Sequence, residues 1–289
     1  MNVTALSRMV KFEHSLFALP FAAAAAVLVS SQARLDPLRL LLVALAVVSA
    51  RTAAMAMNRI ADRAFDTENP RTKGRELVTG AVSARAAWLL LVGSAAAFVA
   101  LAWAVRPLCG ALALPVLAIL LGYSYGKRFT WAVHLWLGLA QALGPIGVAI
   151  ALTGEAPAAA LVLGLGVGAW VAGFDVLYAL QDEEFDRHTR LHSIPARFGA
   201  QGALLWSRLL HVFAAVAIAA AGLLAHRGAG WFAGSVLMTA LLAAEHVYAA
   251  PGGDLRRDRI GAAFFQFNAF ASVGFAVCAI GDLALRSAP

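Results

Sequence analysis

Acidic side chains recur at helical spacing in two stretches of this 289-residue sequence. In the first stretch, Asn58, Asp62 and Asp66 are each four residues apart, which places them on one face of a helix. Carboxylate oxygens are hard ligands, and Mg²⁺ binds proteins through one or two carboxylates together with substrate phosphates. The first stretch therefore predicts part of a site for a divalent metal and a phosphate group.

The second stretch repeats the pattern with Asp175, Tyr178, Asp182 and Asp186, at intervals of three and four residues. These residues also share one helix face, and we expect the two acidic faces to confront each other across a cavity. Asp175 lies inside an apolar run, where a charge costs about 2.5–3.5 kcal/mol on insertion scales and therefore indicates function. The nearby glutamates are interpreted as solvated helix ends that pair with nearby arginines: Glu68, Glu76, Glu183 and Glu184.

Basic residues accompany both acidic stretches. Carboxylates that face each other repel unless cations lie between them, and Arg binds phosphate through paired hydrogen bonds. Arg51 lies within an apolar run, on the same helix face as Asn58, and is a candidate for binding an anion; a structural pair with an acidic residue is the alternative. The other cations close to the acidic stretches are Arg63, Arg71, Lys73, Arg75, Lys127, Arg128 and Arg187. Together these residues predict a membrane enzyme with a phosphorylated substrate.

The composition requires a membrane to position these residues. The chain is 61% hydrophobic and 13% charged, whereas soluble domains have about 45–50% apolar and about 25% charged residues. A soluble fold and a disordered chain are both excluded. The net charge of +7 is attributed to cytoplasmic loops rather than to nucleic-acid binding. Cys109 and Cys278 are predicted to be core residues without a disulfide.

The apolar runs predict an all-α integral membrane protein with about nine transmembrane helices in one bundle. We expect a single polytopic domain over 1–289, with two similar halves at roughly 1–153 and 154–289. Two long polar loops follow the second and sixth spans. The expected spans are about 14–32, 38–64, 85–105, 107–124, 131–153, 157–181, 201–225, 229–249 and 260–284.

The basic residues also predict an orientation. Most of them fall in segments predicted to lie on the same side of the membrane as the N-terminus. This indicates a cytoplasmic N-terminus and a site mouth on the cytoplasmic face of the inner membrane. The first apolar run imitates a signal peptide, but Glu13 and Pro20 favour an uncleaved helix. His14 and Asn268 are expected to make hydrogen bonds between helices.

Both acidic motifs together resemble the paired aspartate-rich motifs of the UbiA superfamily of intramembrane prenyltransferases. The resemblance covers nearly the whole chain and includes the flanking residues Glu13–Phe17, Asn69–Thr72, Lys127–Arg128 and His192–Ser193. A common form of the first motif has Asp after the Asn, where this chain has Arg59. Because residue 59 lies about 100° around the helix from Asn58, we expect this departure to leave the motif's face intact.

The resemblance implies a UbiA-like fold and transfer of a polyprenyl group from polyprenyl diphosphate to a small aromatic acid beside membrane lipid. Flanking sequence is similar to 4-hydroxybenzoate polyprenyltransferases and, more closely, to the menaquinone-route branch with a 1,4-dihydroxy-6-naphthoate acceptor. A haem or chlorin acceptor is one alternative. A membrane ion or metal transporter with an acidic pathway is another, although transporter sites lie nearer the bilayer midplane than these acids.

The resemblance also implies roles for the residues. Two Mg²⁺ ions, with Mn²⁺ as a possible substitute, are expected on Asp62, Asp66, Asp182 and Asp186, which are catalytic together with Tyr178. Asn58 and Asp175 are expected to act through water. The expected substrate-binding residues are Asn58, Arg51, Lys127, Arg128, Asp175, Arg71 and His192.

Overall fold

The structure is a computed structural model that describes residues 3–11 and 15–287, and every regular element in those ranges is a helix. The predicted all-α fold is therefore confirmed. Within these ranges, eight segments are long and apolar enough to cross a membrane, as expected of an integral membrane protein. They are Pro37–Glu68, Ala84–Val105, Pro107–Arg128, Val133–Thr153, Ala158–His188, Ile194–Leu224, Ala229–Ala249 and Arg257–Arg286.

The first predicted span, at about 14–32, corresponds to a helix that is shorter than expected. Helix α2 (Ser15–Leu28) has 14 residues, fewer than the roughly 20 that span a bilayer. A second difference concerns the helix predicted at about 201–225. Helix α9 (Ile194–Leu224) begins earlier, and Gly199 breaks it with a φ of 71°, a left-handed conformation that glycine adopts without strain.

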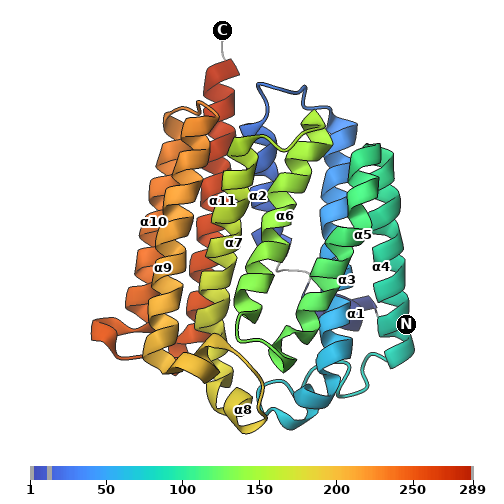
Figure 1. The fold of residues 1–289 in the computed structure, drawn as a ribbon, viewed down its shortest axis with the longest axis vertical. Coiled ribbons are helices and arrows are strands. Elements are labelled where there is room, and N and C mark those ends of the chain that lie inside the picture. Colours follow the sequence, from blue (N-terminus) through green and yellow to red (C-terminus); the bar gives the residue numbers. More distant parts are fainter. Residues whose placement is uncertain (1–2, 12–14, 288–289) are drawn as a thin grey trace. The chain divides into compact units, whose positions relative to one another are not determined.

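The chain packs as two compact units, Met1–Ser15 with Asp36–Tyr125, and Leu16–Leu35 with Gly126–Pro289. The similarity of two halves divided near residue 153 stays a prediction. The first unit holds α1 (Val3–Met9), α3 (Pro37–Glu68), α4 (Ala84–Val105) and α5 (Pro107–Gly122) (Figure 1).

In the first unit, α3 is the central helix. It starts at Pro37 behind the N-cap residue Asp36, whose carboxylate accepts the Arg39 N–H at 3.2 Å. The small side chains of Ala53 and Ala56 let α1 and α4 pack closely on α3. The core of this unit also includes Ala5, Leu6, Met9, Val10, Leu77, Val82, Ala87 and Leu91.

In the second unit, α7 (Ala158–Ala179) is buried along almost its whole length, between α6 (Val133–Thr153) and α9 (Figure 1). Glycines make this close packing possible. A Cβ on Gly138 of α6 would lie 2.6 Å from the carbonyl oxygen of Gly168 on α7, so only glycine fits. The unit is completed by α2, α8 (Glu183–His188), α10 (Ala229–Ala249) and α11 (Ile260–Ser287).

Candidate active site

Asn58 and Asp62 form a hydrogen-bonded pair on α3. The Asn58 amide donates from Nδ2 to Asp62 Oδ2 at 2.8 Å, as their spacing of one helical turn allows. The predicted shared face of these two residues is therefore present in the structure.

Asp66, one turn further along, binds a cation of the following loop. Arg75 Nη1 lies 2.7 Å from both carboxylate oxygens of Asp66, which is buried. The turn at Asn69 brings Arg75 back, because the Asn69 carbonyl accepts the Thr72 N–H and its side chain accepts the Arg71 N–H. The loop predicted from sequence is thus folded against the end of α3.

Arg51 and Arg59 both reach from α3 to the end of α1. Arg51 donates to the carbonyl oxygens of Val10 at 3.2 Å and Lys11 at 2.9 Å. Arg59 donates from Nε to the Met9 carbonyl at 3.1 Å. These bonds of Arg51 go to backbone carbonyl oxygens, and its predicted contact with an anion stays a prediction.

In the second unit, Asp175 has a partner that the sequence did not indicate. His134 Nδ1 on α6 lies 2.6 Å from Asp175 Oδ2 on α7, and the His134 side chain is buried. The glycine contact between Gly138 and Gly168 holds the two helices close enough for this bond. Tyr178, one turn along from Asp175, packs its ring 4.4 Å from the ring of Phe264 on α11.

The predicted continuous helix through the second motif is interrupted. After α7 ends at Ala179, a short 3₁₀ helix (Leu180–Asp182) leads into α8. Asp186 is almost fully buried and accepts hydrogen bonds from Lys127 Nζ, at 3.0 Å to Oδ2 and 3.3 Å to Oδ1. Lys127 thereby contacts the second motif, and its role in substrate binding stays a prediction.

Glu183 is not the solvated helix end that the sequence suggested. Its side chain is buried, and its two oxygens lie 3.0 Å from Arg187 Nη2 and 2.5 Å from Arg257 Nη2. Arg257 also donates to the Leu180 carbonyl, where the helix changes from α to 3₁₀. The sequence offered no signal for this contact, because 77 residues separate its partners.

The remaining predicted residues lie at the edges of these clusters. The side chains of Arg71, Arg128 and His192 are exposed, and the His192 N–H donates to the Lys127 carbonyl at 2.6 Å.

Asn268 makes the interhelical bond predicted for it, accepting the Trp170 indole N–H at 2.7 Å. His14 lies outside the described residues. That the two motifs face each other across a cavity stays a prediction.

The donor set fits a metal that is shared with a substrate. Among the described residues, no three His, Cys, Asp or Glu side chains gather closely enough to enclose an ion. Each unit holds two of the four predicted metal ligands, and Arg75 and Lys127 each bind one of these four. A hard cation bound by one or two carboxylates completes its coordination with water and substrate phosphate oxygens, which matches this arrangement.

The helical membrane fold and the two aspartate motifs, each with one aspartate bound to a cation, are typical of an intramembrane enzyme. The model of the UbiA prenyltransferase family matches residues 18–270, and the chain belongs to this family. It is 34% identical to a protein named 4-hydroxybenzoate octaprenyltransferase from Aromatoleum aromaticum, over 87% of this chain and 85% of that protein.

Solved structures agree with this fold. A UbiA homolog from Aeropyrum pernix K1, solved in the apo state, superposes with a TM-score of 0.82 at 32% identity, covering 96% of this chain and 98% of the homolog. A UbiA homolog from Archaeoglobus fulgidus bound to DMAPP and Mg²⁺ gives a TM-score of 0.68 at 22% identity, covering 94% of this chain and 99% of the homolog.

Proposed function

We propose that this prenyltransferase transfers a polyprenyl group from polyprenyl diphosphate to the ring of a small aromatic acid. The observation that carries the proposal is the pairing of a buried aspartate with a cation in each motif, Asp66 with Arg75 and Asp186 with Lys127. In the reaction, the C–O bond to diphosphate breaks, a C–C bond to the ring forms, and the ring loses a proton.

The chain's cations act on the leaving diphosphate. Breaking the C–O bond places negative charge on the diphosphate, and preorganised donors stabilise such charge most strongly away from water. Arg75 and Lys127 hold the charge of Asp66 and Asp186 in the described structure, and each can donate to a phosphate oxygen instead. The apolar membrane-spanning helices are proposed to keep water from the prenyl cation and so to protect it from hydrolysis.

The four aspartates are proposed to hold two Mg²⁺ ions together with the diphosphate, with Asn58 and Asp175 acting through water. When bound, the metal supplies Lewis-acid stabilisation of the leaving group. Tyr178 is proposed to present its ring or its hydroxyl to the reacting group, with the ring held in place by its packing against Phe264. Arg51, Arg71, Arg128 and His192 are proposed to bind substrate around this centre.

The acceptor is proposed to be 4-hydroxybenzoate or 1,4-dihydroxy-6-naphthoate. The name of the Aromatoleum aromaticum relative supports the first, and the sequence flanking the motifs supports the second. The deciding experiment gives membranes containing the protein one polyprenyl diphosphate and both acceptors in competition, with products identified by mass spectrometry. Prenylation of neither acceptor would refute the proposal and direct the test to haem or chlorin acceptors.

The orientation is also part of the proposal. We expect the protein to lie in the inner, cytoplasmic membrane with both motifs at the cytoplasmic side, because basic residues flank the motifs. Labelling of single cysteines placed in the loops after α3 and α8, in a background without Cys109 and Cys278, tests it. If both loops are labelled from the outer side of intact cells, the proposed orientation is wrong and the motifs lie on the opposite side of the membrane.

A further inference from the structure

Arg59 occupies an unusual position beside the first motif. Arg59 lies next to Asn58 on a membrane-spanning helix, and only 4% of its surface is exposed. Besides the bond from Nε to the Met9 carbonyl, its Nη1 donates to Asn58 Oδ1 at 3.2 Å. Position 59 lies on another helix face than Asn58, yet its long side chain folds back onto Asn58, a contact that the sequence did not indicate.

This bond determines which way the Asn58 amide points. An amide has an accepting oxygen on one side and a donating NH₂ group on the other. Because Arg59 binds the oxygen, the NH₂ group is left to face the Asp62 carboxylate, where it donates at 2.8 Å. A flipped amide would turn its oxygen toward that carboxylate and its NH₂ group toward the guanidinium, and both contacts would be repulsive.

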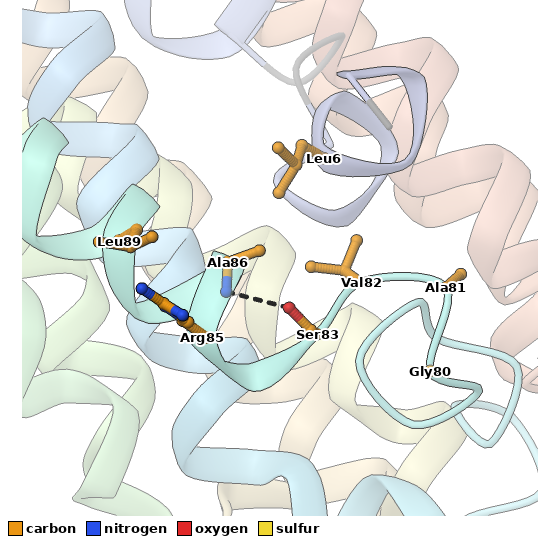
Figure 2. Close-up of a pocket in the computed structure, with 8 residues that line it drawn as sticks. All are labelled: Leu6, Gly80, Ala81, Val82, Ser83, Arg85, Ala86 and Leu89. Carbon is orange, nitrogen blue, oxygen red and sulfur yellow. Dashed lines mark hydrogen bonds between the residues drawn. The ribbon is translucent and has the colours of Figure 1, made fainter. Parts of the chain in front are cut away.

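The other end of the connection is the short helix α1. With seven residues, α1 is too short to be a stable helix alone, so its position depends on α3. A cavity of about 370 Å³ lies along it, lined by Leu6, by the loop at Gly80–Ser83 and by the start of α4 (Figure 2). Ala5, Met9 and Val10 are buried against α3, and the bonds from Arg51 and Arg59 add polar contacts that fix the end of α1.

We infer that Arg59 is a positioning residue of the first motif, which links the end of α1 to Asn58 and, through Asn58, to Asp62. The inference rests on the proposed function for the role of Asn58 and Asp62 in the reaction. It gives α1 a part in catalysis without any contact with substrate. It also explains why a donor at position 59 suits this chain, since Asp at that position has no N–H to offer Asn58.

The test compares Arg59→Gln, Arg59→Lys and the control Arg63→Gln, which changes an exposed arginine one turn along α3. Hydrogen exchange of the α1 amides in detergent reports the attachment of α1. Steady-state prenyl transfer gives kcat, both KM values and the Mg²⁺ concentration for half-maximal rate. We expect Arg59→Gln to speed α1 exchange and to lower kcat, each by about tenfold or more, because charge-assisted hydrogen bonds are lost.

Two further results separate positioning from general destabilisation. Arg59→Lys, which keeps one donor, should recover part of kcat and of the Mg²⁺ dependence. In a double-mutant cycle, Arg59→Gln should add little to Asn58→Ala, because both changes break the same connection. Should the Gln variant fail to accumulate, the cycle is run with Arg59→Lys.

Parent-like kcat and α1 exchange in Arg59→Gln would overturn the inference, and so would full additivity with Asn58→Ala. An Arg63→Gln variant with the same defects would also overturn it. Failure of the proposed function looks different, since the unmodified protein would then transfer no prenyl group. The exchange comparison would still decide whether Arg59 holds α1.

Discussion

Arg75 Nη1 lies 2.7 Å from each carboxylate oxygen of Asp66, across the loop that follows α3. In the proposed mechanism, the negative charge of this buried carboxylate helps to hold Mg²⁺. We therefore expect Asp66→Asn to lower turnover by about a hundredfold or more, as loss of one preorganised group does in other active sites. Asp182→Asn should behave alike. Glu68→Gln, at an exposed position on the same helix, is the control, and full activity of Asp66→Asn would remove Asp66 from the site.

Arg75 itself should act on the diphosphate. Arg75→Gln removes a charge-assisted donor, a change that costs roughly 1.5–3 kcal/mol, so we expect KM for the prenyl diphosphate to rise about tenfold. Arg75→Lys should show a smaller rise, because it keeps the charge and loses the planar pair of donors. A rise in the acceptor KM alone would contradict this assignment.

Chelation should stop the reaction. The carboxylates of the two motifs and the diphosphate are hard oxygen donors, so EDTA should abolish prenyl transfer. Mg²⁺ or Mn²⁺ should restore it better than Ca²⁺, because the smaller ions suit near-octahedral geometry. Product formation by a chelated, metal-free preparation would refute metal dependence, and thermal unfolding of the same preparation shows whether the protein stays folded.

Arg257 should support the second motif. Its bonds to the Leu180 carbonyl and to Glu183 fix the backbone just before and after Asp182. We expect Arg257→Gln to lower kcat by about tenfold with little change in either KM. Its neighbour Arg256 is the matched control, since Arg256 pairs only loosely, at 3.5 Å, with the exposed Asp258 and such surface pairs contribute about 0–1 kcal/mol. Equal effects of the two substitutions would refute the role of Arg257.

The contact between α6 and α7 should tolerate no methyl group. A Cβ at Gly138 would meet the Gly168 carbonyl oxygen at 2.6 Å, whereas one at Gly144, on the same helix, would meet nothing within 4 Å. Overpacking costs about 1–3 kcal/mol, so Gly138→Ala should lower the Tm by several degrees and Gly144→Ala should not. Indistinguishable melting curves in detergent would show that α6 can shift away from α7.

The sequence predicted those parts of the site that repeat along one helix. The pair Asn58–Asp62 and the location of Asp175 and Tyr178 follow from intervals of three and four residues, since i and i+4 meet on a helix surface. The apolar runs predicted the long helices because about 20 apolar residues are needed to span a bilayer. The break after Ala179 was missed because no glycine or proline marks it, and the stabilising contact comes from Arg257.

The contacts between distant segments could not be predicted. Arg59 finds its acceptor 50 residues away, and His134 meets Asp175 across 41 residues. Helical periodicity carries no information at such separations. Glu183 was misjudged for the same reason, because a glutamate beside arginines at a helix end is typical of a solvated surface. Which charges are buried depends on the tertiary packing.

The attachment of α1 to α3 has a practical side. Met9, Val10 and Lys11 supply carbonyl acceptors to Arg59 and Arg51. Trimming the first dozen residues, or fusing a rigid partner close to them, would take these acceptors from two guanidinium groups in a membrane-spanning helix. A purification handle or a fluorescent reporter therefore belongs behind α11, at the end of the chain that takes no part in this contact.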